Sequence, residues 1–354
     1  LILKGPPARI ARDADGNWTK AAEGYARKNG LALDELEIRD LDGTDYLYAE
    51  REEKGRGAIE VLAEIIPQFF GAIHWYKTMR WGDGQDNFVR PVQWLVALLG
   101  KTTIPCTFAG VGSGSMSHGH RFMHPDPLHV PADSEGYKAA LRKAFVLVDQ
   151  DERRETIRQQ IQETAAAEGL VWRTDEGLLT EVSYLLEWPK AVLCSFPEEY
   201  LEVPDLVLVS EMKGHQKQLA LVDADGKLSH KFIGVSNMIC EDMSKVREGY
   251  QNVLISRFSD AKFFLREDQK RTLESRIEDL GGTIFQARLG TILEKVQRIE
   301  ALADWIAGQL EMDLTQRAHV SQIARLCKTD LTTLMVYEFP ELQGEVGRYY
   351  AINE

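Results

Sequence analysis

Apolar residues follow two different spacings along this chain. Up to about residue 237, helical spacing and the strict alternation of a strand take turns. From about residue 242 to Tyr350, only helical spacing remains. The pattern predicts an α+β domain over residues 1–240 and an all-helical region over residues 241–354.

Local signals define the individual elements. Thr19 is a suitable N-cap for a helix that runs to about Lys28 and stops at Asn29-Gly30. The spacing also predicts helices over residues 57–70, 269–279 and 314–337, an edge strand over 45–52, a strand over 145–148, and a hairpin with strands over 216–222 and 228–235.

The longest apolar run lies within the stretch from Lys77 to Pro125. Its middle, from Val92 to Leu99, predicts a buried strand with Trp94 in the core. Arginine, tryptophan and histidine gather at both ends of this run. Cations and aromatic rings at the rim of a sheet suit contact with an anionic partner that carries rings.

Charge and composition narrow the class of protein. Among 354 residues, 42 Lys and Arg stand against 55 Asp and Glu, a net charge of −13. This balance argues against a protein that coats nucleic acid along its whole length, but it allows a local basic patch. The four cysteines are widely spaced, so we expect free thiols in a reducing cytosol. No apolar run reaches the roughly 18 residues of a membrane span. Because the chain starts without Met, inside an apolar run, we expect a fragment.

Four histidines lie close together at His118, His120, His124 and His129. Imidazoles this close could bind zinc, but no cysteine or second histidine pair completes a ligand set. We therefore expect no metal site. Instead, His120 and Arg121 are expected to lie at the rim as polar contacts for a partner.

Arg80 and Arg90 are the strongest candidates for contact with RNA. Each stands near a tryptophan, and a guanidinium beside an aromatic ring could bind a phosphate or stack a base. Catalytic groups are harder to find. Glu338 and Glu341 flank a proline and could exchange protons, but no third group joins them. The sequence has no phosphate loop, nucleophile elbow or zinc-protease motif, and we predict no catalytic residue.

A second polar group precedes the predicted hairpin. It contains Lys213, His215, Gln216 and Lys217, and Gly214 would let a backbone approach closely. These side chains could hold phosphates of RNA. A solvated turn is the alternative, because charge runs are often only wet surface.

Short motifs span the chain in a fixed order. They include Gly5-Pro6-Pro7, Met79-Arg80-Trp81, Phe88-Val89-Arg90-Pro91, Gly119-His120-Arg121-Phe122, His215-Gln216-Lys217, Val235-Ser236-Asn237, Phe285-Gln286, and Lys328-Thr329-Asp330-Leu331. In this order the motifs resemble the bacterial glycyl-tRNA synthetase β subunit. Each motif alone is weak, but the ordered set is specific.

The resemblance implies a subunit of an α2β2 ligase that attaches glycine to tRNA(Gly) with ATP and Mg²⁺. Its active site would lie on the α subunit, so this chain would bind no cofactor itself and would be inactive alone. The expected partners are the α subunit, tRNA(Gly) and a second β subunit, in the cytoplasm and away from membranes. The residues expected to contact tRNA are Arg80, Arg90, His120, Arg121, Lys213, His215, Gln216 and Lys217.

The resemblance also implies a fold. Residues 1–240 would form a mixed α/β domain of the B3/B4 type, and residues 241–354 would begin an HD-like helical domain. The C-terminal anticodon-binding part of the family would lie outside this chain. Two alternatives stay open: a hydrolytic editing module with a closed pocket around His120 and Arg121, and a scaffold without RNA contact.

Overall fold

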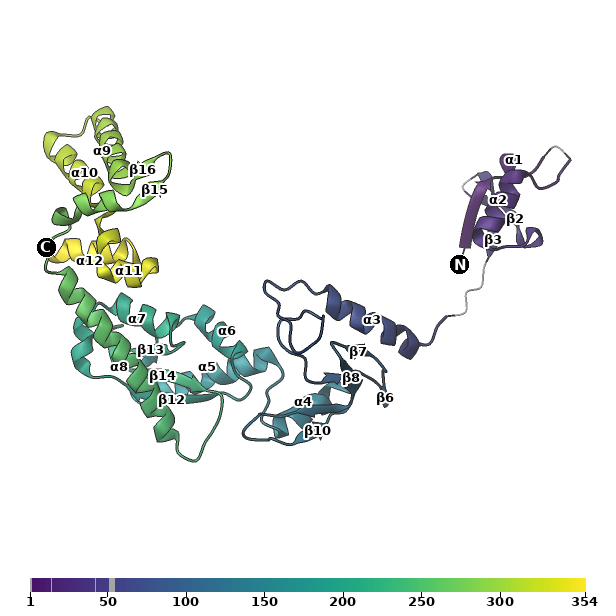
Figure 1. Cartoon of the computed structure of the whole chain (residues 1–354), viewed down its shortest axis with the longest axis horizontal. Helices are drawn as coiled ribbons and strands as arrows, with labels where there is room; N and C mark the ends of the chain where they lie inside the picture. The colour runs from purple at the N-terminus through teal and green to yellow at the C-terminus, as the bar shows by residue number, and fades with distance from the viewer. Residues whose placement is uncertain (1, 14, 42, 51–54) are drawn as a thin grey trace. The chain divides into compact units, whose positions relative to one another are not determined.

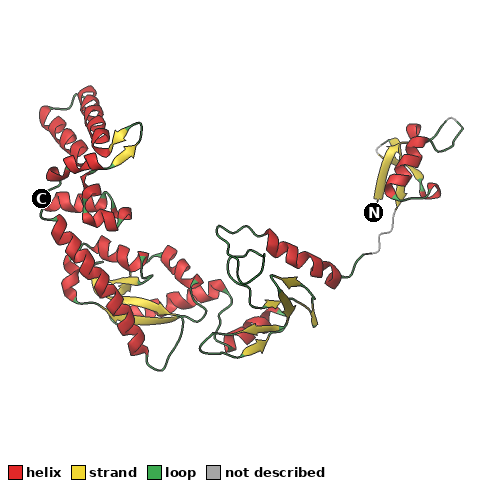
Figure 2. Cartoon of the chain, in the orientation of Figure 1, coloured by secondary structure: helices red, strands yellow, loops and turns green. Residues whose placement is uncertain are grey.

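The computed structural model describes residues 2–13, 15–41, 43–50 and 55–354, which form two compact units that divide between Gly114 and Ser115. Both units contain helices and strands (Figure 1 and Figure 2), so the predicted α+β class is confirmed. Within the described ranges, no helix has both the length and the apolar character needed to cross a membrane. The assignment to B3/B4-type and HD-like domains stays a prediction.

A small antiparallel sheet and a helix open the chain. The elements are β1 (Ile2–Pro7), α1 (Ala8–Ala11), α2 (Lys20–Asn29), η1 (Leu33–Glu35), β2 (Glu37–Leu41) and β3 (Thr44–Glu50). The helix after Thr19 is confirmed, and it ends at Gly30, whose left-handed φ of 65° lets the chain turn away. The strand predicted over residues 45–52 is confirmed as β3 for the described residues, and residues 51 and 52 lie outside them. Its expected edge position is wrong, because β3 lies between β1 and β2. Fully buried Leu47 of β3 shares a core with Ala22 of α2.

The rest of the first unit is one helix packed on short strands. The elements are α3 (Ala58–Ala72), β4 (Leu95–Val96), β5 (Leu98–Leu99), β6 (Thr102–Thr103), β7 (Thr107–Phe108) and β8 (Val111–Gly114). Leu62 and Ile66 of α3 pack against the buried residues Ala97 and Ile104. One helix therefore covers one face of these strands.

The predicted buried strand over residues 92–99 is wrong. The run is divided at Ala97, because β4 pairs in parallel with β8 whereas β5 pairs antiparallel with β6. Trp94 is 45% exposed instead of lying in the core. An uninterrupted apolar run does not specify which strands pair, and here the pairing changes within the run.

The second unit begins with β9 (Met116–His118), β10 (Pro127–His129) and α4 (Ser134–Lys143). The strand predicted over residues 145–148 is wrong, because the chain there forms the turn that ends α4 and then continues without regular structure. Phe145 has a left-handed φ of 59°, and the Val146 N–H donates to the Leu141 carbonyl at 2.9 Å. This hydrogen-bond pattern closes the C-terminus of a helix with one residue in the left-handed region.

A four-stranded antiparallel sheet forms the centre of the second unit. Its strand order is β11-β13-β14-β12. The bounds are β11 (Val171–Trp172), β12 (Lys190–Ser195), β13 (Leu219–Val222) and β14 (Leu228–Ser236). The predicted hairpin is confirmed as β13 and β14.

Helices cover both faces of this sheet. They are α5 (Gln150–Ala166), α6 (Glu176–Tyr184), α7 (Asp205–Gly214) and α8 (Met243–Asp268), with the 3-10 helix η2 (Glu198–Glu202) after β12. Successive strand residues point to opposite faces. Accordingly, Leu219 and Ile233 pack with α5 and α6, whereas Ala220 and Phe232 pack with α7 and α8. The alternation of apolar residues thus builds a three-layer arrangement.

Helices dominate the C-terminal part. The elements are η3 (Glu274–Arg276), η4 (Glu278–Gly282), β15 (Ile284–Gln286), β16 (Gly290–Thr291), α9 (Ile292–Gln309), α10 (Leu314–Leu326), η5 (Thr329–Thr332), α11 (Leu334–Glu338), η6 (Pro340–Leu342) and α12 (Glu345–Asn353). The helix predicted over residues 269–279 is wrong, since only 3-10 turns form there. The helix predicted over 314–337 is interrupted between α10 and α11, where Asp268 accepts hydrogen bonds from the Leu334 and Met335 N–H groups.

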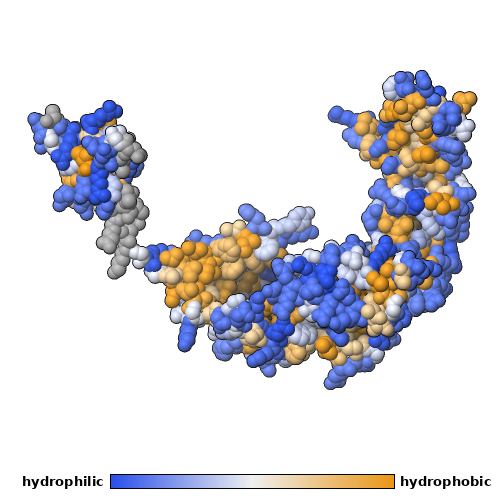
Figure 3. Space-filling model, turned by 180° about the vertical axis from the view of Figure 1, so that it is seen from behind, coloured by the Kyte–Doolittle hydropathy of each residue, from blue (hydrophilic) through white to orange (hydrophobic). Residues whose placement is uncertain are grey.

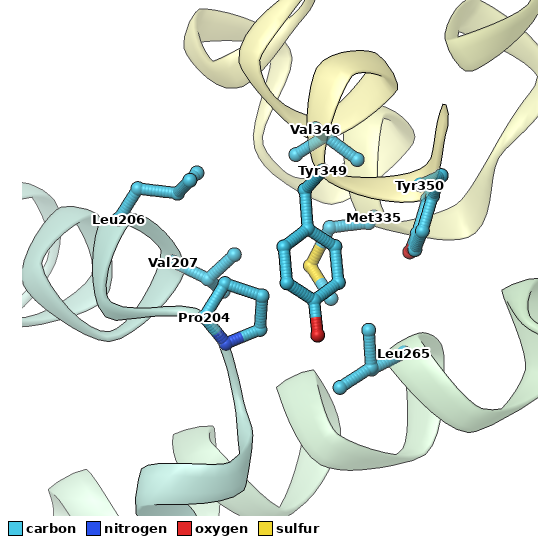
Figure 4. A pocket seen from close by; sticks show the side chains of 8 residues that line it. All are labelled: Pro204, Leu206, Val207, Leu265, Met335, Val346, Tyr349 and Tyr350. Atoms are coloured by element: carbon cyan, nitrogen blue, oxygen red, sulfur yellow. The ribbon is translucent and has the colours of Figure 1, made fainter. Parts of the chain in front are cut away.

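One hydrophobic core joins the sheet to the C-terminal helices. Phe232 of the sheet, Leu265 of α8 and Met335 of α11 belong to the same buried cluster. Figure 4 shows a shallow apolar pocket at this junction, where the rings of Tyr349 and Tyr350 face Leu265. Residues on both sides of the expected boundary near residue 240 therefore share a core. The boundary itself stays a prediction.

Candidate nucleic-acid interface

An aromatic cluster fixes the loop that carries Arg80 and Arg90. Met79 and Phe88 form an antiparallel bridge, with hydrogen bonds of 2.9 and 3.3 Å between their backbones. The Phe88 ring lies 5.2 Å from the ring of Trp75, centre to centre. Burying an aromatic ring anchors a loop with few other contacts. Arg80 directly follows one partner of this bridge, and Arg90 lies two positions after the other, so the bridge holds the backbone next to both arginines.

Both guanidinium groups are exposed. Arg80 Nε donates to Asn87 Oδ1 at 3.3 Å, and Arg90 Nη1 donates to the Val89 carbonyl at 2.8 Å. Neither forms an ion pair with a carboxylate of the described residues. Tyr76 nearby in the chain is 99% exposed and Trp94 is 45% exposed. Cations without an ion-pair partner and exposed aromatic rings are the groups that a surface for single-stranded nucleic acid uses.

A hydrophobic surface lies close by in the same unit. Ile65 and Phe69 of α3 are 49% and 61% exposed, and Figure 3 shows apolar side chains gathered over this helix. Large exposed apolar patches commonly mark contact surfaces. The unit that carries Arg80 and Arg90 therefore also presents an apolar surface on α3.

The motif around His120 has a structural role. A Cβ on Gly119 would lie 2.5 Å from the Cβ of Ala144, so only glycine fits there. His120 is 3% exposed, and its Nδ1 accepts hydrogen bonds from the Phe122 and Met123 N–H groups at 3.3 and 3.2 Å. The expectation that His120 lies at an accessible rim is wrong, because its imidazole is buried and accepts the N–H groups of the turn that follows it. Its contact with tRNA stays a prediction that this burial disfavours.

The neighbours of His120 divide between surface and local structure. Arg121 is exposed, and Phe122 is 70% exposed. His124 Nδ1 donates to the Asp126 carbonyl at 3.0 Å, and His129 Nδ1 lies 3.1 Å from Ser115 Oγ. No group of three or more His, Cys, Asp and Glu side chains able to hold a metal ion occurs in the described part of the chain. Of the two residues expected to contact a partner here, Arg121 is therefore the accessible one, and His120 is buried.

The second predicted group forms ion pairs. Lys213 Nζ lies 2.5 Å from Asp175 Oδ2, and Lys217 Nζ lies 2.9 Å from Glu181 Oε1. His215 Nδ1 lies 3.0 Å from Oε2 of Glu211. These acidic neighbours reduce the positive potential that the segment offers to phosphates. The assignment of Lys213, His215, Gln216 and Lys217 to tRNA contact stays a prediction, as does the solvated turn.

Asp175 holds this segment against the sheet. Its Oδ1 accepts the Leu178 N–H at 2.8 Å and so caps α6. Burial opposes ionisation of the carboxyl, but hydrogen bonds from Lys213 and the Leu178 backbone outweigh it and lower the pKa of Asp175. Asp175 is therefore ionised at neutral pH, and its ion pair with Lys213 ties the end of α7 to the start of α6.

The predicted residues are divided between the two units. Arg80 and Arg90 belong to the unit that ends at Gly114, and the others belong to the unit that begins at Ser115. Sequence reasoning also missed Trp172 and Gln218, two buried residues that carry polar atoms without hydrogen-bond partners. The sequence did offer one signal for Gln218: a glutamine directly before the apolar run 219–222 is a candidate for a buried polar residue.

By fold and surface, the chain is an α+β protein with a candidate interface for nucleic acid. It belongs to the family described as glycyl-tRNA synthetase beta subunit, whose model matches residues 2–354. The family resemblance drawn from the motifs is thus confirmed.

Named relatives agree with this assignment. The chain is 44% identical over 351 residues to the glycine--tRNA ligase beta subunit of Desulforamulus reducens, covering 99% of this chain and 50% of the relative. It is 44% identical over 354 residues to that of Trichlorobacter lovleyi, covering 100% and 51%, and 44% identical over 347 residues to that of Myxococcus xanthus, covering 98% and 49%. The chain spans about half the length of these relatives.

Proposed function

We propose that this chain is part of the β subunit of a glycine–tRNA ligase and contributes tRNA binding and assembly to the attachment of glycine to tRNA(Gly). The family match over residues 2–354 carries the proposal. In this proposal ATP and Mg²⁺ are used by the complete enzyme, with the active site on the α subunit. The partners are the α subunit, tRNA(Gly) and a second β subunit, in the cytoplasm.

The tRNA contacts are assigned first to Arg80, Arg90 and Arg121. All three are exposed, and no carboxylate among the described residues neutralises Arg80 or Arg90. Such guanidinium groups can neutralise phosphates directly, whereas a cation already held by a carboxylate must first lose that partner. Lys213 and Lys217 therefore contribute less in this proposal.

Reconstitution tests the proposal. The complete β subunit that contains this chain is mixed with the α subunit, and attachment of labelled glycine to tRNA(Gly) is measured. Neither subunit alone should charge tRNA, and the mixture should. The matched control replaces the β subunit with a heat-denatured sample. A mixture that forms a stable complex but never charges tRNA(Gly) contradicts the proposal.

A further inference from the structure

A tight turn carries Arg121 and Phe122 at the end of a two-stranded hairpin. β9 and β10 pair antiparallel, and residues 121–123 form a turn in the connection between them. The Phe122 turn, as we call residues 119–124, presents a phenylalanine that is 70% exposed beside an exposed arginine. A single exposed apolar residue is ordinary on a protein surface, so the structure that supports this ring decides what its exposure means.

Hydrogen bonds fix the turn from within. The His120 N–H donates to the Ala144 carbonyl at 2.8 Å, and the His124 N–H donates to the His120 carbonyl at 2.8 Å. The buried imidazole of His120 accepts the N–H groups of Phe122 and Met123 through Nδ1. A group that is already held in one conformation loses little entropy when a partner binds it. The turn is therefore suited to present the Phe122 ring for recognition.

The charges around the turn favour an anionic partner. Arg121 and Lys143 are exposed, and neither forms an ion pair with a carboxylate of the described residues. Lys143 lies one residue before the carbonyl that accepts the His120 N–H. The sequence contains no Asp or Glu between Asp86 and Asp126, although the whole chain carries a net charge of −13. A segment without carboxylates in an acidic protein is a place where a polyanion meets the least repulsion.

A ring and a guanidinium on adjacent residues narrow the class of anion. Aromatic side chains stack on nucleobases whose faces are free, and arginine binds phosphates through paired N–H groups. Bases inside a duplex are already stacked on one another, so a ring on a turn reaches only an unpaired base. A free phosphate or an acidic protein would use Arg121 but would leave Phe122 in water. RNA with an unpaired segment uses both side chains.

We propose that the Phe122 turn binds an unpaired segment of RNA, with one base stacked on the Phe122 ring and a phosphate bound by Arg121. His120 is a positioning residue, because it holds the turn but is itself buried. This inference deepens the proposed function, and it rests on that function only for the choice of tRNA as the RNA.

Binding of single-stranded and double-stranded RNA to the 354-residue chain tests the proposal. Fluorescence anisotropy is measured with a labelled RNA strand of about eight nucleotides, first alone and then annealed to its complement as a blunt duplex. We expect the single strand to bind at least about fivefold more tightly than the duplex, because one base stacked on an aromatic ring contributes at least that factor.

Substitution of the ring separates stacking from attraction between charges. Phe122→Ala should weaken binding of the single strand at least about fivefold, but it should leave duplex binding and the salt dependence unchanged, because the ring carries no charge. Phe122→Tyr keeps an aromatic ring and should bind the single strand as the original chain does. The matched control Phe263→Ala removes a ring on α8 that is 55% exposed and should change neither affinity.

The two neighbours of Phe122 should respond differently. Arg121→Ala should weaken binding and reduce the slope of log affinity against log salt by about 0.7, whereas Arg154→Ala removes an arginine already held by Asp151 at 2.8 Å and should not. His120→Ala should abolish the preference for the single strand. His120→Asn should restore it, because an amide oxygen accepts the same N–H groups. A lowered Tm with an unchanged preference would contradict the positioning role.

Three results overturn the proposal. The first is that the chain binds neither RNA, and the second is that it binds strand and duplex equally. The third is unchanged single-strand affinity in Phe122→Ala; weaker association of that variant with the α subunit would then show that the ring contacts protein. Reconstituted glycine attachment separates this failure from that of the proposed function. Charging without a single-strand preference refutes only the role of the Phe122 turn, and that preference without charging refutes only the ligase assignment.

Discussion

The hydroxyl of Tyr350 donates a hydrogen bond of 3.0 Å to Oδ2 of Asp268, although 82 positions separate the two residues. The same carboxylate accepts the N–H groups of Leu334 and Met335 and lies 3.4 Å from the guanidinium of Arg276. Burial, followed by the charge of Asp268, raises the pKa of Tyr350, so the hydroxyl keeps its proton. Asp268 thus ties the end of α8 to α11 and α12.

Removing the Tyr350 hydroxyl should destabilise the second unit. Tyr350→Phe deletes a hydrogen bond to a buried charge, which is worth about 1–3 kcal/mol. Urea unfolding measures the loss. Tyr349→Phe is the control, because the Tyr349 hydroxyl bonds to no described residue and its loss should cost under about 0.5 kcal/mol. Equal losses in both variants would contradict the role of Asp268.

Gly119→Ala should destabilise the turn around His120. The new Cβ would lie 2.5 Å from Ala144 Cβ and 2.6 Å from the Ala144 carbonyl oxygen. Overpacking of this kind costs about 1–3 kcal/mol. Thermal unfolding with calorimetry measures the change. Gly249→Ala in α8 meets no atom within 4 Å and should be neutral or stabilising, so a loss there as large as at Gly119 would show that close contact is not the cause.

Charge reversal at Arg80 and Arg90 should weaken tRNA binding by the complete subunit. Each lost phosphate contact lowers the affinity and reduces the slope of log affinity against log salt by about 0.7–0.9. Filter binding across a salt series measures both quantities. Arg39→Glu is the control, because it makes the same change of charge at a residue already paired with Glu37 and Glu50. Unchanged affinity in Arg80→Glu and Arg90→Glu would favour a scaffold without RNA contact there.

Cys194 should resist alkylation until the chain unfolds. Burial raises the pKa of its thiol to about 11, whereas an unfolded cysteine titrates near about 8.5. Between these values the unfolded state loses the proton and the folded state keeps it, so stability falls as pH rises from about 8.5 to about 11. Iodoacetamide labelling at pH 9, read by mass spectrometry, should modify exposed Cys327 long before Cys194. Labelling of both at one rate would contradict this protection.

Regular elements with strong local signals were predictable from the sequence. The hairpin of β13 and β14 has two alternating apolar runs around an Asp-Gly turn, and α2 ends at Gly30, where glycine adopts a positive φ at little cost. Both features depend on neighbours in the chain. The family could likewise be recognised, because its motifs keep their order over the whole sequence.

Features that depend on distant partners were not predictable. Trp94 lies in an apolar run, but its exposure follows from a change of strand partner at Ala97. His120 resembles a surface contact in the sequence, yet its imidazole is buried because Gly119 packs against Ala144. Gln218 becomes notable only when its carboxamide proves to be buried without a partner. Burial and pairing are decided by tertiary contacts, which spacing alone does not encode.

The buried cluster that includes Phe232, Leu265 and Met335 has a consequence for anyone who shortens this polypeptide. A cut near residue 240 looks safe from the change in sequence character, but it would remove α8 from the face of the central strands that it covers and would deprive α11 and α12 of their packing partners. Each piece would then expose apolar surface to solvent and would aggregate. Soluble expression should start upstream of α5, which covers the other face of the sheet, and continue through Tyr350.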